Sequence, residues 1–263
     1  MSQLPENTPL LAHPLAEEPV FTAKKLMESV RSLRKLDEQA APQLCFLEFD
    51  GDLTDWLVAQ GKAHEDPAWA CFHTKMYCLE LAGLRCGVIP RTIGGPYAVL
   101  VAEQLVAAGC RWIVGLTSAG RVDPKLPLPC MVLASGAVRD EGTSLHYLPP
   151  GRLVHCPVSL DEGWVEELRT IGWAVRRGEV WTTDAPYRET QSQLQGWQQQ
   201  GVLAVEMQAA SLYAFGQAKG VKVLVIAMVS NAVDHEGEQI DTGSLGDGLK
   251  ILEACARTVV KME

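Results

Sequence analysis

The sequence predicts an α/β fold in which helices alternate with the strands of a largely parallel sheet. Short apolar runs bounded by turn residues recur along the chain, which is typical of buried strands. Longer segments between them have apolar residues at helical spacing, and several end at glycine. The two kinds of segment alternate from Pro42 to the C-terminus, the order that builds βαβ units.

The N-terminal third begins with a proline-rich stretch, residues 1–20, where we expect an extended arm because proline disfavours helix and strand interiors. Residues 21–39 place Leu26, Val30 and Leu33 on one helical face. We expect a strand over 43–49, a strand pair over 69–81 and 85–91, and a helix over 96–109 that stops at Gly109.

The remaining elements continue the alternation. Strands are expected over 111–117, 129–138, 179–184 and 222–230, and helices over 161–172, 208–220 and 244–262. The sequence has no internal repeat and no low-complexity linker. Residues 21–263 are therefore expected to form a single domain.

Composition excludes several classes of function. The net charge is −9 and no dense Lys/Arg run occurs, so we expect no nucleic-acid partner. The longest apolar run, residues 223–229, is too short to span a bilayer, and the N-terminus does not resemble a signal peptide. The eight cysteines form no C-x-x-C pair. We expect a cytoplasmic protein with reduced thiols, no metal site and no membrane contact.

Polar residues gather where the predicted strands end. Thr117 and Ser118 follow one strand, residues 182–184 follow another, and Ser230 and Asn231 follow a third. In open α/β sheets, ligands bind at the carboxyl ends of the strands. The pattern thus predicts a ligand site at this edge.

Two polar residues stand in an otherwise apolar stretch. Glu206 and Gln208 lie within residues 204–215, between runs that have the composition of a buried core. A buried carboxylate or amide is costly unless it has hydrogen-bond partners. Glu206 and Gln208 therefore each need a hydrogen-bond partner, either in the folded chain or in a ligand.

Common catalytic motifs are absent. The run Gly115–Gly120 has one residue too many for the G-x-S-x-G elbow of serine hydrolases, and neither a Walker loop nor G-x-G-x-x-G is present. Five dispersed segments instead occur in the order found in the nucleoside phosphorylase family, and the chain resembles the uridine phosphorylase type of that family. These segments are residues 92–106, 136–149, 182–190, 202–216 and 223–234.

The resemblance implies a three-layer α/β/α fold around a central mixed sheet. It also implies cleavage of the N-glycosidic bond of a small-molecule nucleoside, with phosphate attacking the sugar carbon through an oxocarbenium-like state. No cofactor is expected, and inorganic phosphate is the possible co-substrate. Members share sites between subunits, so a homodimer or homohexamer is expected.

The resemblance also assigns roles in sugar binding and catalysis. Met207 is expected to face the ribose, and Gln208 takes the place of a family glutamate that binds the sugar hydroxyls. Ser118 is a further ribose contact, and Glu206 is expected to be structural, paired with backbone donors. Asn231 replaces the aspartate that protonates purines in relatives, so Asn231 and Gln208 are the candidate catalytic residues.

Base recognition is assigned to the stretch 182–190. Arg188 is the candidate for contacting the base, with Thr183, Asp184 and Tyr187 shaping the pocket and Asn231 at the base edge. Arginine only donates hydrogen bonds, so it suits the carbonyls of uracil or of a 6-oxopurine.

Phosphate binding is where the chain departs from the family. The expected contacts are Gly51, Thr117, Ser118 and His73. Two family arginines are replaced, one by Asp55 and one by Gly115. Losing two charged hydrogen bonds costs about 3–6 kcal/mol, or roughly 10²- to 10⁴-fold in phosphate affinity.

Three functions stay open at this point. Phosphorolysis of a uridine-like or 6-oxopurine nucleoside follows from the retained base and ribose positions. A nucleosidase, in which water replaces phosphate, follows from the lost arginines. A non-catalytic nucleoside-binding or storage-type protein follows from the combined exchanges at Asp55, Gly115, Gln208 and Asn231.

Overall fold

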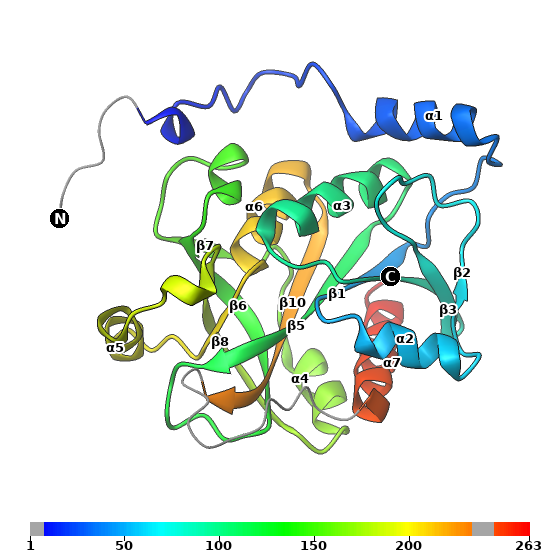
Figure 1. The fold of residues 1–263 in the computed structure, drawn as a ribbon. Helices are drawn as coiled ribbons and strands as arrows, with labels where there is room; N and C mark the ends of the chain where they lie inside the picture. The colour runs from blue at the N-terminus through cyan, green and yellow to red at the C-terminus, as the bar shows by residue number, and fades with distance from the viewer. Residues whose placement is uncertain (1–7, 233–244) are drawn as a thin grey trace.

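The computed structural model describes residues 8–232 and 245–263, which form a mixed α/β fold (Figure 1). The helices are α1 (Ala23–Arg34), α2 (Asp52–Ala59), α3 (Gly95–Ala107), α4 (Glu162–Arg169), α5 (Gln191–Gln199), α6 (Ala209–Lys219) and α7 (Leu245–Met262), with short 3₁₀ helices η1 (Pro9–Leu11), η2 (Thr143–His146) and η3 (Pro186–Arg188). The strands are β1 (Leu44–Glu48), β2 (His64–Glu65), β3 (Tyr77–Leu81), β4 (Leu84–Pro90), β5 (Trp112–Arg121), β6 (Cys130–Asp140), β7 (Leu153–His155), β8 (Ala174–Thr183), β9 (Ala204–Glu206) and β10 (Lys222–Ala232).

One mixed sheet joins these ten strands in the order β10-β6-β8-β9-β5-β1-β4-β3-β2, with β7 beside β6. Strand β1 is parallel to β4 and β5, β5 to β10, and β8 to β6 and β9. Because β10 also pairs with β5, strands β5, β10, β6, β8 and β9 close into a ring. The sheet is therefore mixed, as expected, and it is closed rather than open in this half of the molecule.

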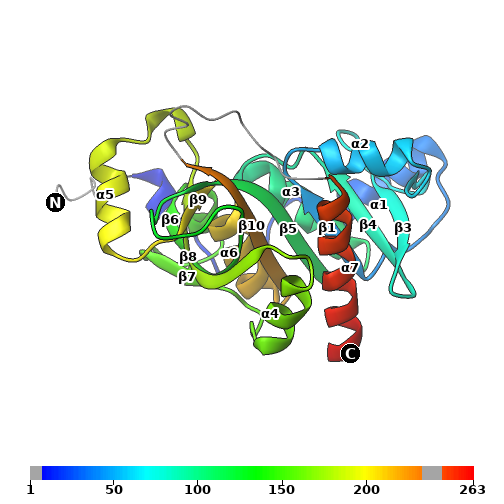
Figure 2. The same ribbon diagram turned by 90° about the horizontal axis from the view of Figure 1, so that it is seen from below.

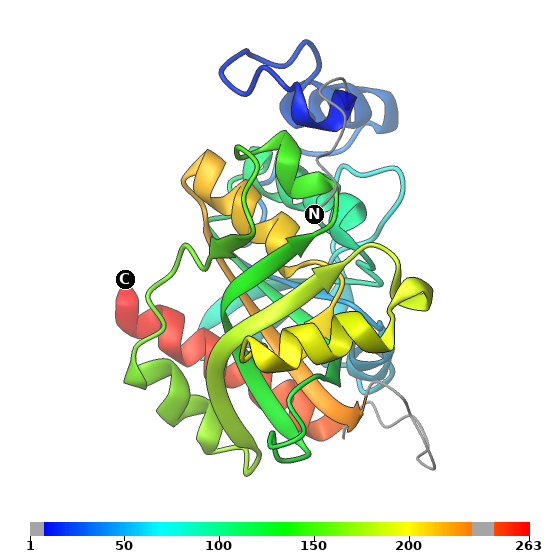
Figure 3. The same ribbon diagram turned by 90° about the vertical axis from the view of Figure 1, so that its left-hand side faces the viewer.

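Helices cover both faces of the sheet. Helices α1, α3 and α6 pack over one apolar cluster, and α2, α4 and α7 over a second on the other face (Figures 1 and 2). Helix α5 lies beside β8 at a third, smaller cluster that contains Trp181 and Trp197 (Figure 3). None of the described helices is long and apolar enough to cross a membrane.

Several elements differ from the sequence prediction. Helix α2 and helix α5 were not predicted, and β5, β6, β8 and β10 are longer than expected. The first half of the predicted strand 69–81 is loop. On α1, the buried residues are Met27 and Val30, whereas Leu33 is 72% exposed, so the predicted apolar face is rotated by about one position. The described part of the arm carries the 3₁₀ turn η1.

Helices α3 and α6 approach closely where both begin. A Cβ on Gly95 would lie 2.1 Å from the Ser211 hydroxyl oxygen, so this contact requires glycine. The first turns of the two helices are thereby held side by side at the candidate ligand edge of the sheet.

A buried carboxylate fixes the start of α6. The Glu206 carboxylate accepts hydrogen bonds from the backbone N–H groups of Gln208 (2.7 Å) and Ala209 (2.8 Å) and from the Thr182 hydroxyl (2.5 Å). The same Thr182 hydroxyl accepts from the Ala210 N–H at 3.0 Å. Glu206 is therefore structural and paired with backbone donors, as predicted.

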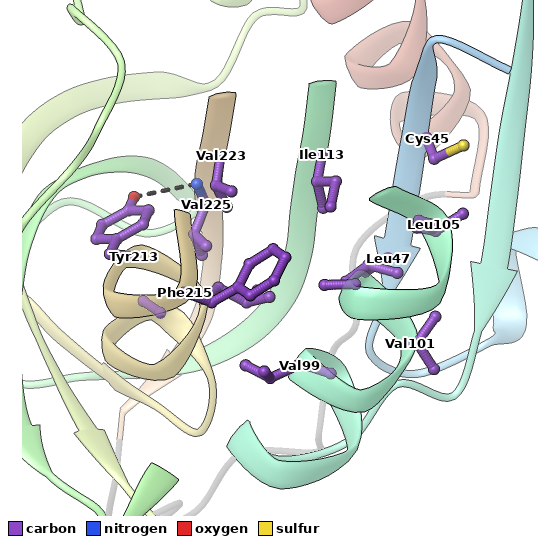
Figure 4. Close-up of a cluster of buried hydrophobic side chains, with 14 of the residues drawn as sticks. Cys45, Leu47, Val99, Val101, Leu105, Ile113, Tyr213, Phe215, Val223 and Val225 are labelled. Carbon is purple, nitrogen blue, oxygen red and sulfur yellow. Dashed lines mark hydrogen bonds between the residues drawn. The ribbon is translucent and has the colours of Figure 1, made fainter. Parts of the chain in front are cut away.

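Tyr213 ties α6 to the ring (Figure 4). Its buried hydroxyl donates to the carbonyl of Ala134 in β6 (2.6 Å) and accepts from the N–H of Val225 in β10 (3.0 Å). We predict that Tyr213→Phe lowers the free energy of unfolding by about 1–3 kcal/mol, because two buried backbone groups lose a partner. Urea denaturation measures this, with the exposed Tyr187→Phe as control. Equal stability of the two variants would contradict the tie.

The pH dependence of stability tests the environment of Glu206. Burial raises the pKa of this carboxyl from 4.5 to about 7, and its hydrogen bonds only partly offset the rise. Between these values the native chain keeps a proton that the unfolded chain releases, so stability falls as pH rises. We predict that Glu206→Gln gains on the wild type by on the order of 3 kcal/mol across this window. Denaturation at a series of pH values checks this, and parallel pH profiles would refute it.

Candidate functional site

The candidate site lies at the carboxyl ends of β1, β5 and β8 and the first turn of α6. Gln208 is the N-cap residue of α6 and is fully buried. Within the described residues, neither its amide oxygen nor its amide nitrogen has a hydrogen-bond partner. A Cβ on Gly115 of β5 would lie 3.8 Å from the Gln208 amide nitrogen, so this amide faces the bare backbone of β5. An unpaired buried amide is costly, which makes Gln208 a candidate ligand-binding residue.

A second unpaired polar atom lies at the start of α6. One oxygen of the buried Glu141 carboxylate accepts from the Ser144 N–H (2.9 Å) and from the Ser211 hydroxyl (2.6 Å). The other oxygen has no partner among the described residues. The charge of Glu141 also contributes to the raised pKa of Glu206. The Glu141 carboxylate thus lies against the first turn of α6 with one oxygen available to a ligand.

The turn between β1 and α2 contains the most saturated group of the site. The Glu48 carboxylate is buried and accepts from the N–H groups of Gly51 (3.0 Å), Leu53 (2.9 Å) and Thr54 (2.9 Å). The Thr54 hydroxyl donates to it as well. Burial raises the pKa of Glu48, and these bonds lower it. The first turn of α2 is therefore capped from within the chain.

Ser118 and Thr117 lie at the end of β5. The Ser118 hydroxyl donates to Asp50 at 3.0 Å, and the Thr117 hydroxyl donates to the Ser118 carbonyl at 2.9 Å. Burial raises the pKa of Asp50, the Ser118 bond lowers it, and nearby Asp52 raises it further. The Ser118 and Thr117 hydroxyls, which were expected to contact ribose and phosphate, thus already have hydrogen-bond partners within the chain.

An ion pair covers the same turn. Arg91, in a left-handed conformation after β4, forms a bidentate pair with Asp55, with guanidinium nitrogens 2.5 and 3.3 Å from the two carboxylate oxygens. Gly51 has a φ of +95°, which favours glycine, and a Cβ there would lie 2.7–2.9 Å from the Arg91 side chain. Among the described residues, the cation nearest to Gly51 is therefore Arg91, which the sequence did not indicate as a site residue.

The expected base-binding residues gather in part. Thr183, Asp184 and Arg188 line a cavity of about 190 Å³, together with Asp140, Trp181, Ala185, Glu189 and Gln193. Asp184 accepts from the Gly142 N–H at 2.9 Å, which joins the loops after β6 and β8. Tyr187 is 99% exposed and does not line this cavity.

The other expected residues are placed as follows. Met207 is half-buried beside Gln208. His73 lies on the α3 side, with its ring against Tyr97 and Gln104. Asn231 is in β10, opposite Gly120 of β5, and its side chain lies outside the described residues.

Sequence reasoning missed Glu48, Asp50, Arg91 and Glu141. A signal was available for two of them: Glu48 and Asp50 stand at the end of a predicted strand, where polar groups were otherwise noted. Arg91 gave no such signal because its reach over Gly51 depends on a left-handed backbone that arginine rarely adopts.

Nucleoside phosphorylases are among the known proteins that this chain is similar to. A guanosine phosphorylase from Halorubrum lacusprofundi is 29% identical over 143 residues, which cover 52% of this chain and 57% of that protein. The uridine phosphorylase of Escherichia coli K12 is 24% identical over 178 residues, covering 62% of this chain and 70% of that protein. A DeoD-type purine nucleoside phosphorylase from Clostridium novyi is 24% identical over 158 residues, covering 57% and 66%. The match to the guanosine phosphorylase thus spans less than two thirds of that relative.

The family model described as the phosphorylase superfamily matches residues 48–261, from the last residue of β1 to the last turn of α7. This range contains the ring of strands, the capped start of α6 and every residue of the candidate site. The chain therefore belongs to the phosphorylase superfamily.

Proposed function

We propose that this protein cleaves the N-glycosidic bond of a nucleoside and transfers the sugar to a nucleophile. The observation that carries this proposal is the fully buried, unpaired amide of Gln208 at the ligand edge of the sheet. Ribose hydroxyls both donate and accept, and an amide offers the complementary donor and acceptor. The names of the relatives support phosphorolysis as the family reaction, with phosphate as co-substrate.

The geometry also suggests how the bond would be weakened. Cleavage develops positive charge on the sugar, and groups fixed in place before the reaction stabilise such charge most effectively. The Glu141 carboxylate accepts from the Ser211 hydroxyl in the first turn of α6, and its other oxygen has no partner among the described residues. Its negative charge would stabilise the positive charge that develops on the sugar ring, while the neutral Gln208 amide would hold the sugar hydroxyls.

We propose a uracil-like or 6-oxopurine base. Arg188 lines the cavity beside Thr183 and Asp184, and a guanidinium donates to carbonyl oxygens but cannot accept from an amino group. The Asp184 carboxylate is held by the Gly142 N–H, which supports a fixed loop around this cavity.

A nucleoside panel tests the function. We predict release of the base from uridine or inosine and none from adenosine, measured by chromatography of the products.

Arg188→Ala should reduce binding of the preferred nucleoside by roughly tenfold or more, because a charged hydrogen bond contributes about 1.5–3 kcal/mol. Binding without release from any member of the panel would instead identify a non-catalytic nucleoside-binding protein. Neither binding nor release would refute the proposal.

Replacing Gln208 with an apolar residue should raise the stability of the protein and weaken nucleoside binding. Gln208→Met keeps the volume but removes two buried polar atoms that lack partners, so we predict a rise in the free energy of unfolding of about 1–3 kcal/mol. The same change should weaken nucleoside binding, because the sugar loses its partners. Denaturation and calorimetry measure the two effects. Gln217→Met on the exposed side of α6 is the control. Loss of stability without loss of binding would place Gln208 outside the site.

A further inference from the structure

The four residues expected to hold phosphate all have partners within the chain. The Gly51 N–H donates to Glu48, and the Ser118 hydroxyl donates to Asp50. The Thr117 hydroxyl donates to the Ser118 carbonyl. The His73 ring completes the set and is treated next.

His73 is engaged by two neighbouring side chains. The Gln104 amide lies 3.2 Å from Nε2 of His73, and the Tyr97 hydroxyl lies 3.4 Å from Nδ1. Partial burial lowers the pKa of His73, which favours the neutral imidazole, and a neutral imidazole offers phosphate no charge.

The Glu48 carboxylate takes the place of an anion at the first turn of α2. It is buried, and it uses three backbone N–H groups and one hydroxyl, the same kind of donors that a bound phosphate needs. A phosphate at this turn would displace these bonds or lie beside a carboxylate. Repulsion between two such charges about 4 Å apart lowers affinity by on the order of 10²- to 10³-fold.

The surrounding charge is acidic. Asp50, Asp52 and Asp55 belong to the same turn and the start of α2. The guanidinium that lies against Gly51 is that of Arg91, and Asp55 already pairs with it. In the described part of this turn, the N–H donors and the Arg91 guanidinium that could bind an anion are therefore already paired within the chain.

We propose that the nucleophile is water, and that the protein is a phosphate-independent nucleosidase. This inference rests on the proposed function, since it concerns the second substrate of the same reaction. The water oxygen bonds to the anomeric carbon of the sugar as the carbon–nitrogen bond breaks. The bonding electrons leave with the base, which takes up a proton from solvent, and Asp50 accepts the proton that water loses. The products are the free base and the free sugar.

The decisive experiment compares phosphate-free buffer with millimolar phosphate, using the wild-type chain and the nucleoside that it cleaves. We expect base release in both buffers at rates within about twofold, and free ribose as the sugar product. Calorimetry with inorganic phosphate alone should show no binding at millimolar concentration. Release that requires phosphate, ribose 1-phosphate as the product, or measurable phosphate binding would each overturn the inference.

Two variants show whether the internal carboxylates cause this. Glu48→Ala combined with Asp50→Ala should gain phosphate binding by about tenfold or more, since the backbone N–H groups at the start of α2 and the Ser118 hydroxyl lose their internal acceptors. Asp161→Ala removes the capping carboxylate of α4, away from the site, and should lose stability without gaining phosphate binding. If the double variant does not fold, the wild-type measurements decide. Absence of release in both buffers would overturn the proposed function, and hydrolysis with it.

Discussion

Buried carboxylates that bind backbone N–H groups determine the shape of the ligand edge. Glu48 fixes the start of α2 at the end of β1, and Glu206 fixes the start of α6 beside β8. A carboxylate removed from water is tolerated only when its oxygens are hydrogen-bonded. Each of these residues therefore requires a particular backbone path around it. The position of Gln208, of Gly51 and of the end of β5 follows from that requirement.

The same constraint separates the polar groups of this edge into two kinds. Glu48 and Glu206 are saturated by the chain, so they stabilise the fold and have little capacity for a ligand. Gln208 and one oxygen of Glu141 are buried and unpaired, so they cost stability in the absence of a ligand. Proteins keep such costly groups at functional sites, where binding supplies the missing partner. The number of hydrogen-bond partners therefore separates candidate ligand groups from structural ones more directly than polarity does.

Sequence could predict the alternation of strands and helices, because periodicity and glycine stops are local signals, as at Gly109. The ring of five strands could not be predicted, because the pairing of β10 with β5 joins strands more than a hundred residues apart and leaves no local sequence pattern. Helix α2 was missed since its first residues resembled a phosphate turn. In the site, Thr183 and Arg188 could be grouped because they follow one strand. The partners of Glu48 and Arg91 depend on turn geometry and could not.

The saturation of Glu48 also bears on how a phosphorylase fold could change its second substrate. A turn that binds phosphate has N–H groups that are unpaired in the free protein, which lowers its stability. The Glu48 carboxylate satisfies those groups from within the chain. If water is the second substrate, as proposed above, arginines beside this internal anion would have no phosphate to hold, which would account for Asp55 and Gly115 at the two expected arginine positions. The position of Arg91 is consistent with this explanation, because its guanidinium forms an ion pair with Asp55 instead of facing a ligand.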